Sequence, residues 1–282
     1  METVTIEDVK KIVLPVRGSH KGQNGRLLII GGSHLFHAAS LWALTVASRI
    51  VDLVHYCSVP ENNDLVKKEF RNGIVVPRSD LDAYIAEDDV ILIGPGMVRA
   101  DGDLTGVTYT LGSLKEVDEI ENEGILTYHL TKFLLKMYPQ KQWVIDAGAL
   151  QMLELQDIPR NAILTPHHGE FTHAFGNAEV ADVAKKYHCI VLLKGDKDVA
   201  SNGQETRVIE GGNPGMTKGG TGDVLAGLIA ALACKNDPFV ATLAGSFINK
   251  KAGDALYTKV GPFFNATDLA NQIPLTMKEL LL

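Results

Sequence analysis

The chain has 282 residues, of which 45% are hydrophobic and 22% charged, and its formal net charge is −7 at pH 7. This composition is typical of a globular protein with a sizeable core, and the acidic balance argues against binding of nucleic acid or a membrane surface through a basic face. The first residues, METVTIEDVKKIVL, have acids where a signal peptide needs bases, and no apolar run reaches the roughly 20 residues that cross a bilayer. We therefore expect a cytoplasmic protein without a membrane partner.

Short apolar runs rich in β-branched residues predict strands that are buried on both faces. In chain order these runs are residues 26–32, 53–59, 90–96, 143–149, 162–167 and 190–195. Helical spacing is found at 38–51, more than once within 114–137, and at 178–187, 224–233, 239–256 and 267–281. This alternation predicts an α/β fold, with a mostly parallel central sheet and helices on both faces. No linker or charge block divides the chain, so we expect one domain over residues 1–282.

Glycines gather where the predicted strands end, and they are densest in one loop, residues 211–222, that leads into a predicted helix. The carboxyl edge of an open α/β sheet is where ligands bind. The loop matches neither a P-loop, since Lys218 lacks the preceding glycine and following hydroxyl, nor the Rossmann fingerprint, whose third glycine is missing. It can still bind an anion, because the first N–H groups of a helix lack partners.

Asp223 begins the helix after this loop, and its position allows two interpretations. It can cap the helix, a role for which Thr221 competes. It can also act as a general base that takes a proton from an attacking hydroxyl beside the anion site. The spacing alone leaves both open.

Several motifs, in this order along the chain, resemble those of the ADP/ATP-dependent NAD(P)H-hydrate dehydratases, a family of the ribokinase-like superfamily. The stretches are KGQNGRLLIIGGS (21–33), LIGPGM (92–97), VIDAGAL (144–150), LTPHHGEF (164–171), LLKGDKDV (192–199) and GNPGMTKGGTGDVLAGL (212–228). The pair TPH-x-GE and GGTGD is specific to this family, because sugar and vitamin-precursor kinases share GxGD but usually lack TPH-x-GE. The resemblance implies a three-layer ribokinase-like fold, and no part of the chain resembles the epimerase domain of some family members.

In this family ADP or ATP phosphorylates the hydroxyl of the hydrated nicotinamide ring, and loss of phosphate restores NADH or NADPH. The resemblance implies that Asp223 is the base and that the N–H groups of Gly220, Thr221 and Gly222 stabilise the transferring phosphoryl group. The implied contacts to the hydrated dinucleotide are Ala38, Gly96, His167 and Asp223, and those to the adenine nucleotide are Lys194, Gly195, Asp196, Lys197, Asp198 and Gly222. It also implies Mg²⁺ as the cofactor and a homo-oligomer, with a tetramer as one form.

Glu170 matches an acid that in related kinases helps to hold Mg²⁺ and phosphate, through phosphate and water. Asp146, at the end of a predicted strand, is either a capping acid or a second functional carboxylate, and Lys218 is either a phosphate contact or a solvated loop lysine. The residues His167, His168, Glu170 and His173 fit no H-E-x-x-H helix, and Pro166 and Gly169 predict a turn at their start, which argues against zinc.

The chain differs from the common family pattern at His37, at residues 49–53 and at His168, all on the side assigned to the dinucleotide. Two other functions remain open on the sequence. A small-molecule kinase of the same superfamily would share the loop and Asp223, and a non-catalytic nucleotide sensor would share the pocket. The intact Asp223 argues against a sensor, which needs no base. The sequence does not give the preference between ADP and ATP, or between the NADH and NADPH hydrates.

Overall fold

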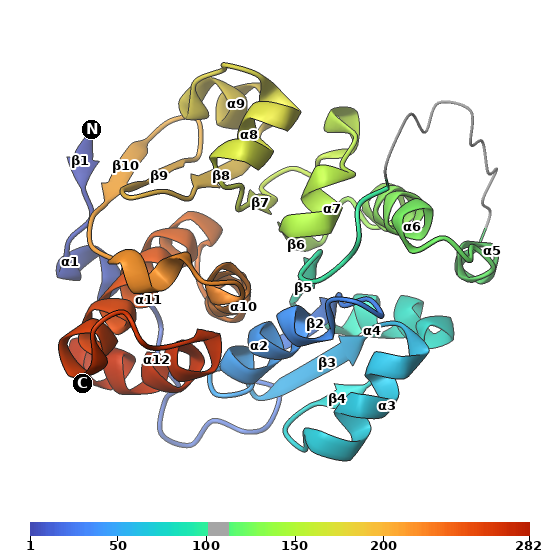
Figure 1. Cartoon of the computed structure of the whole chain (residues 1–282), viewed down its shortest axis with the longest axis horizontal. Coiled ribbons are helices and arrows are strands. Elements are labelled where there is room, and N and C mark those ends of the chain that lie inside the picture. The colour runs from blue at the N-terminus through green and yellow to red at the C-terminus, as the bar shows by residue number, and fades with distance from the viewer. Residues whose placement is uncertain (101–112) are drawn as a thin grey trace.

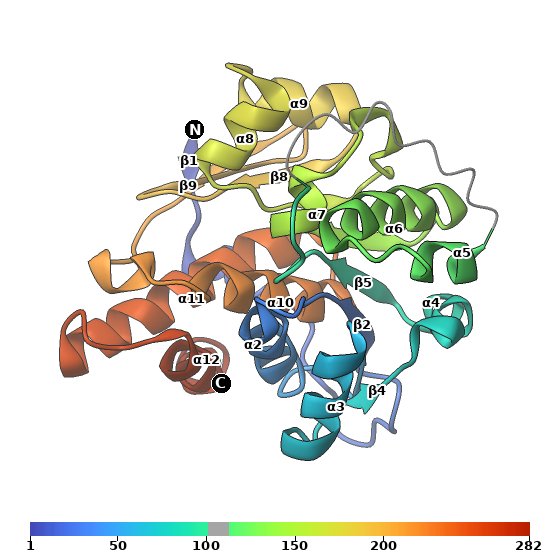
Figure 2. The same cartoon turned by 45° about the vertical axis from the view of Figure 1, so that its right-hand side comes forward.

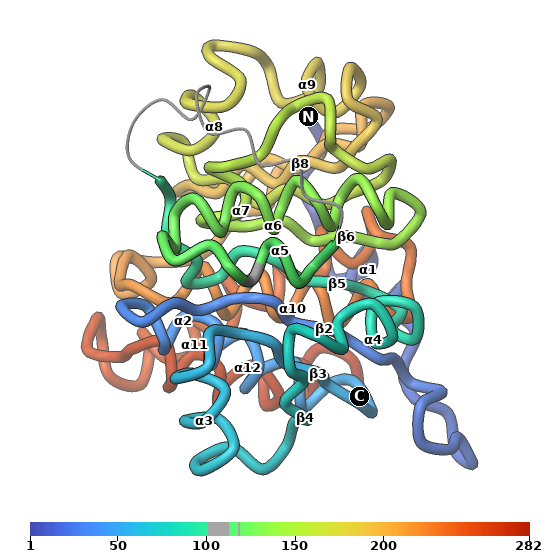
Figure 3. Tube along the Cα trace, turned by 90° about the vertical axis from the view of Figure 1, so that its right-hand side faces the viewer, coloured from blue at the N-terminus to red at the C-terminus, as the bar shows by residue number. Residues whose placement is uncertain are grey.

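The structure, a computed structural model, describes residues 1–100 and 113–282, and a single sheet with helices on both faces dominates it (Figure 1). The strands are β1 (Glu2–Thr3), β2 (Arg26–Ile30), β3 (Leu53–Cys57), β4 (Ile74–Val75), β5 (Val90–Ile93), β6 (Gln142–Ile145), β7 (Ile163–Leu164), β8 (Ile190–Leu193), β9 (Asp198–Ser201) and β10 (Thr206–Ile209). In the described residues their order is β1-β10-β9-β8-β7-β6-β5-β2-β3-β4. Figure 3 shows the succession from β8 to β4.

Neighbouring strands are parallel except where β9 pairs with β8 and with β10. The expected mostly parallel sheet is therefore confirmed. The helices are α1 (Ile6–Val9), α2 (His37–Ala47), α3 (Pro60–Glu69), α4 (Leu81–Glu87), α5 (Leu114–Asp118), α6 (Glu123–Met137), α7 (Ala147–Gln151), α8 (His168–Phe175), α9 (Val180–Tyr187), α10 (Thr221–Ala233), α11 (Pro238–Val260) and α12 (Ala266–Leu281). In the part of the chain described here, no helix is long and apolar enough to cross a membrane.

Two hydrophobic cores lie on opposite faces of the sheet, because successive side chains of a strand point to opposite sides. In β2, Leu27 and Ile29 pack into the core formed with α2, α10, α11 and α12. Leu28 and Ile30 pack into the other core, formed with α4 to α9. Figures 1 and 2 show the two groups of helices on either side of the strands. The three-layer arrangement expected from the sequence is confirmed.

All six predicted strands are present, but several predicted boundaries are wrong. The run 143–149 ends as a strand at Ile145, because Ala147 has a φ of +43° and starts α7. The first predicted helix, 38–51, ends at Ala47. The apolar runs did not reveal β1, β4, β9 or β10, nor the shorter helices α1, α3, α4, α7 and α8, since these elements are short or carry polar side chains.

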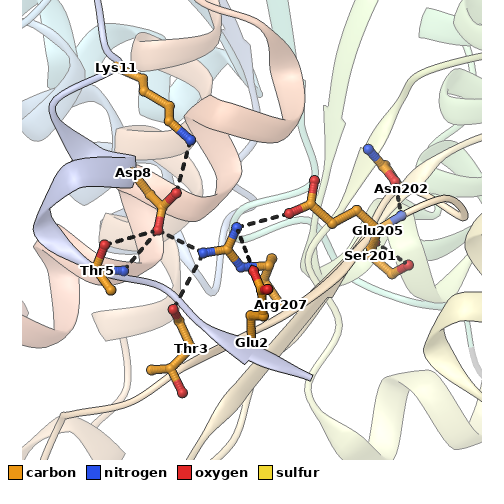
Figure 4. A network of polar contacts seen from close by, with 9 residues as sticks. All are labelled: Glu2, Thr3, Thr5, Asp8, Lys11, Ser201, Asn202, Glu205 and Arg207. Atoms are coloured by element: carbon orange, nitrogen blue, oxygen red, sulfur yellow. Dashed lines mark hydrogen bonds and ion pairs between the residues drawn. The ribbon is translucent and has the colours of Figure 1, made fainter.

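At one edge of the sheet the N-terminal segment is fastened to β10 (Figure 4). The Arg207 guanidinium donates to the Asp8 carboxylate at 2.7 Å and to that of Glu205 at 2.9 Å. Asp8 also accepts from the Thr5 N–H and the Lys11 ammonium, both at 3.0 Å. Burial raises the pKa of Asp8, but the Thr5 N–H and the charges of Lys11 and Arg207 outweigh it and lower the pKa to about 2. This network holds β10, which continues directly into the glycine loop.

Candidate active site

The start of α10 lies at the carboxyl edge of the sheet and depends on a glycine. Gly220 has a φ of +94°, and a Cβ there would lie 2.3 Å from the Trp42 ring. The Thr221 hydroxyl donates to the carbonyls of Met216, at 2.7 Å, and Lys218, at 2.9 Å. These bonds fix the loop before the helix. Within the described residues, the N–H groups of Gly220 and Gly222 have no hydrogen-bond partner, so they are available to an anion.

Asp223 lies on the first turn of α10, and the pKa of its carboxyl is strongly raised. Burial raises the pKa of its carboxyl to about 7, and the negative charge of Asp146 adds to the rise, while the Lys194 ammonium opposes it. A carboxylate with a pKa near the working pH is suited to general-base catalysis. No side chain caps α10 at Gly220, so the capping interpretation of Asp223 has no support.

Lys194 and Asp146 form an ion pair at the ends of β8 and β6. The Lys194 Nζ donates to Asp146 Oδ1 at 2.9 Å, and the Thr165 hydroxyl donates to the same oxygen at 2.8 Å. Asp146 is only 2% exposed and makes no capping hydrogen bond to α7, so its carboxylate is directed to Lys194 and not to the helix. Burial lowers the pKa of Lys194, but the nearby carboxylates of Asp146, Glu170 and Asp223 together raise it above its ordinary value.

Glu170 is buried at the start of α8 and both of its oxygens have partners. Oε2 accepts from the His167 N–H at 2.9 Å, and Oε1 accepts from the Gln151 side chain at 3.0 Å. The His167 ring accepts in turn from the Glu170 N–H at 3.2 Å, which completes a capping box. The Glu170 carboxylate is thus held rigidly beside the ion pair of Lys194 and Asp146.

Two clefts meet at the start of α10. The larger, about 710 Å³, has Gly222 and Thr221 at one side and is lined by the Lys194–Asp196 segment, the 211–214 loop and α11. The smaller, about 490 Å³, is lined by Asp223, Gly96, Gln151 and neighbouring residues of the β5 and β2 loops. Adjacent residues of one helix turn therefore face two separate clefts.

The wall of the larger cleft is organised by Lys250 and Asp198, both buried. The Lys250 ammonium donates to the carbonyls of Gly195, Asp196 and Gly211 at 3.0 to 3.2 Å and lies 3.2 Å from the Asp198 carboxylate. Asp198 also accepts from the Gly195 N–H at 2.9 Å. Together the two side chains fix the 194–198 turn against the 211–212 turn.

Comparison of the sequence and the structure with known proteins identifies the family of this chain. The protein-family model for NAD(P)H-hydrate dehydratases matches residues 27–275 of the chain. The chain belongs to this family. The ADP-dependent (S)-NAD(P)H-hydrate dehydratase of Nitrosopumilus maritimus is 35% identical over 98% of this chain and 97% of its own length. The bifunctional NAD(P)H-hydrate repair enzyme of Methanocaldococcus jannaschii is 34% identical over 96% of this chain, which spans 52% of that protein. The chain thus spans about half the length of its bifunctional relatives.

A crystal structure of the ADP/ATP-dependent NAD(P)H-hydrate dehydratase of Bacillus subtilis, co-crystallised with ATP and Mg²⁺, superimposes with a TM-score of 0.75. It is 23% identical and covers 99% of this chain and 98% of its own. The likeness confirms the ribokinase-like fold expected from the sequence motifs.

The residues that family resemblance assigned to the nucleotide lie together, with one exception. Lys194, Gly195, Asp196, Asp198 and Gly222 line the larger cleft. The exception is Lys197, which points away and forms an exposed ion pair with Glu210 at 2.7 Å. Lys218 lines neither cleft and is exposed, in keeping with the interpretation as a solvated loop lysine, and its ammonium donates to the carbonyls of Phe264, at 2.6 Å, and Pro262.

The residues assigned to the dinucleotide are divided between the clefts. Gly96 and Asp223 line the smaller one, and Ala38 is half-buried on α2 beside Ala39, which does line it. His167 instead lies on the wall of the larger cleft. A substrate in the smaller cleft can contact His167 only if it extends across the junction.

The expected turn at Pro166–Gly169 is wrong, because α8 begins at His168 and contains Gly169 and His173. His167 is its cap, and the His168 ring lies beside Gly195, whose Cβ would be 3.1 Å from His168 Nε2. In residues 1–100 and 113–282 no group of three His, Cys, Asp or Glu side chains is placed to hold a metal ion.

The sequence motifs missed three residues that line the clefts of this family member. Gln151 lines the smaller cleft and donates a hydrogen bond to Glu170. Lys250 and Asn249 line the larger cleft from α11. Gln151 follows directly on the VIDAGAL motif, which could have drawn attention to it. The segment around Asn249 and Lys250 carries no local signal, because its role depends on the packing of α11 against distant loops.

Proposed function

We propose that this chain catalyses the ADP- or ATP-dependent dehydration of the (S)-hydrates of NADH and NADPH, with release of phosphate and AMP or ADP. The observation that carries the proposal is the junction of two clefts at Gly222 and Asp223, with a carboxyl whose pKa is about 7 at that point. The name of the Nitrosopumilus maritimus relative, which spans nearly the same length, supports the choice of substrate and of nucleotide.

In the proposed mechanism the nucleotide occupies the larger cleft and the hydrated ring enters the smaller one. Asp223 takes the proton of the ring hydroxyl, whose oxygen attacks the terminal phosphorus as the bond to the leaving nucleotide breaks. The free N–H groups of Gly220 and Gly222 stabilise the charge on the transferring phosphoryl group. The Thr221 N–H, expected from the sequence to do the same, instead donates to the Lys218 carbonyl at 3.4 Å and helps to hold the turn. Phosphate then leaves with the electrons of its C–O bond, a proton is lost from the adjacent carbon, and the ring double bond is restored.

The charges around the junction fit a nucleotide bound with Mg²⁺. Three carboxylates, those of Asp146, Glu170 and Asp223, act on the single Lys194 ammonium, so a polyphosphate needs further positive charge here. Glu170 would face the metal through phosphate oxygens or water, since its own oxygens already accept hydrogen bonds. When bound, the metal neutralises phosphate charge during the transfer.

The test is an assay with chemically prepared NADH hydrate, Mg²⁺ and either ADP or ATP. We expect the reduced-nicotinamide absorbance to return together with one free phosphate per turnover. No return with either nucleotide would contradict the proposal. A stable phosphorylated product on a sugar or hydroxymethyl heterocycle would instead identify a small-molecule kinase, and nucleotide binding without turnover of any substrate a sensor.

We further propose that the enzyme is a cytoplasmic homo-oligomer that binds no nucleic acid. The net charge of −7 supports the last point. Exposed apolar side chains such as Leu35 and Phe263 support an oligomer, since a second copy can cover them. Size-exclusion chromatography with light scattering measures the assembly, and a tetramer is the first form to test.

A further inference from the structure

One buried polar side chain on the wall of the larger cleft lacks a partner. Asn249 lies on α11, is 3% exposed, and lines the cleft. Its side-chain oxygen has no hydrogen-bond partner in the described parts of the chain. Leaving such a group unpaired costs free energy, and folded proteins rarely do so. A ligand that brings an N–H donor into the cleft would remove this cost.

Two polar neighbours of Asn249 on the same helix, Ser246 and Lys250, are paired with the cleft loops. The Ser246 hydroxyl donates to the Asp198 carboxylate at 2.7 Å, and the Lys250 ammonium donates to three loop carbonyls. These side chains explain how α11 holds the 194–198 and 211–212 turns. Asn249 contributes nothing to that framework, so a structural role within the protein does not account for it.

The larger cleft around Asn249 has a polar end and an apolar wall. Gly222 and Lys194 form an end that suits phosphate, with free N–H groups and an ammonium. Pro214, Met216 and Leu225 supply apolar wall in the same cleft. Met216 is held in place by Gly253, one turn after Asn249, where a Cβ would lie 2.3 Å from the Met216 sulfur. An apolar wall with one unpaired amide suits a flat heteroaromatic base.

We propose that Asn249 recognises the exocyclic amino group of the nucleotide's purine base, which makes it a specificity-determining residue for adenine. Its Oδ1 accepts from the amino N–H, and its Nδ2 donates to the adjacent ring nitrogen, as asparagine pairs with adenine elsewhere. This rests on the proposed function only in that the larger cleft takes the nucleotide. A site built to pair with a donor rejects an analogue that lacks it, because the acceptor then stays buried and unpaired.

The test compares ADP with purine riboside 5′-diphosphate, in which a hydrogen replaces the amino group. Calorimetric binding to the whole chain with Mg²⁺ gives both dissociation constants without any turnover. We expect the wild-type protein to bind ADP roughly tenfold more tightly than the analogue, the cost of one unpaired neutral acceptor. In Asn249→Leu, and in Asn249→Ala as a second variant, the ratio should fall to about two or less, since neither side chain offers an acceptor.

Thr242→Val is the matched control, because Thr242 is a buried polar residue of α11 whose hydroxyl bonds only to the Pro238 carbonyl. It should keep the wild-type ratio. Equal binding of the two nucleotides by the wild-type protein, or an undiminished preference in both Asn249 variants, would overturn the assignment. A preserved preference with no dehydration in the hydrate assay would contradict the proposed function and leave the role of Asn249 standing.

Discussion

The Lys194 ammonium lies 2.9 Å from the Asp146 carboxylate and close to the turn of α10 that carries the proposed base. A Cβ on Gly222 would lie 3.5 Å from the same nitrogen. The ion pair therefore brings one positive and one negative charge to bear on Asp223 with opposite effects on its pKa. The ionisation of the base is set by buried neighbours as well as by its own burial.

Asp146→Asn should shift the pH dependence of the reaction. Asp146 raises the pKa of Asp223 and partly neutralises Lys194, so its loss removes a repulsion and strengthens an attraction. Both effects lower the pKa of the base. The acidic limb of kcat/KM, expected near pH 7 in the wild-type enzyme, should move about one unit lower.

The measurement is a pH profile of kcat/KM for NADH hydrate between pH 5 and 9. Asp157→Asn is the matched control, since Asp157 is another carboxyl whose burial raises its pKa, but it lies beside Lys136 away from the clefts. The acidic limb of the Asp157→Asn profile should stay at the same pH as in the wild-type enzyme. An Asp146→Asn profile that coincides with the wild-type profile would show that the two carboxyls do not interact.

Asp223→Asn should lose activity and gain stability. Removal of a general base costs about 10²- to 10⁴-fold in rate, while the nucleotide in the larger cleft should bind as before. The folded pKa of about 7 lies above the ordinary 3.8, so ionisation of Asp223 destabilises the fold as pH rises from about 4 through 7. At pH 8 the uncharged amide should add about 1–2 kcal/mol, or about 2–3 °C in Tm.

Thermal unfolding at pH 5 and pH 8 checks the sign, because the gain should be larger at pH 8. Asp196→Asn, an exposed acid of the same cleft, should change Tm little at either pH. Near-normal turnover by Asp223→Asn would exclude the base assignment, and an equal or lower Tm at pH 8 would exclude the raised pKa.

Gly220→Ala should destabilise the protein and displace the base. The alanine Cβ would lie 2.3 Å from the Trp42 ring, and the φ of +94° disfavours any side chain. We expect a loss of about 2–4 kcal/mol in urea unfolding and a large fall in kcat. Gly219→Ala is the control, because no atom lies within 4 Å of its added Cβ, and its free energy of unfolding should change by less than about 0.5 kcal/mol.

The sequence predicts the fold well where burial is complete. β5 is apolar on every residue and β2 on every residue after Arg26, because both faces are covered, and this makes them visible without a structure. β9 and β10 were missed because their polar side chains, Asp198 and Arg207 among them, are paired in the interior and do not follow a simple pattern. Their positions at one edge of the sheet depend on contacts distant in sequence.

In the candidate site too, residues in local motifs are predictable from the sequence, and residues placed by contacts distant in sequence are not. Asp223 and Lys194 lie in glycine-rich motifs whose local geometry is needed for phosphate binding, and sequence motifs therefore point to them. The function of Asp146 was ambiguous, since only the tertiary contact with Lys194 distinguishes it from a cap. Asn249 and Lys250 could not be predicted, because α11 reaches the cleft only after it packs across loops more than 30 residues away in the chain.

The network at the sheet edge gives a last prediction, on Asp8. Its folded pKa of about 2 lies below the ordinary 3.8, so the ionised carboxylate stabilises the fold above about pH 4, and this contribution is lost as pH falls through 2. Asp8→Asn should therefore cost about 1–2 kcal/mol at pH 7 and nearly nothing at pH 2. Arg207 would lose its ion pair with Asp8, and amide hydrogen exchange should increase in β1 and β10.

Glu2→Gln is the control, because Glu2 is 86% exposed in its side chain and lies 4.0 Å from the same guanidinium. Such a surface pair contributes little, so stability and exchange should stay close to the wild type. An equal loss of stability at pH 7 and pH 2 would mean that packing, and not the charge of Asp8, holds the N-terminal segment to β10.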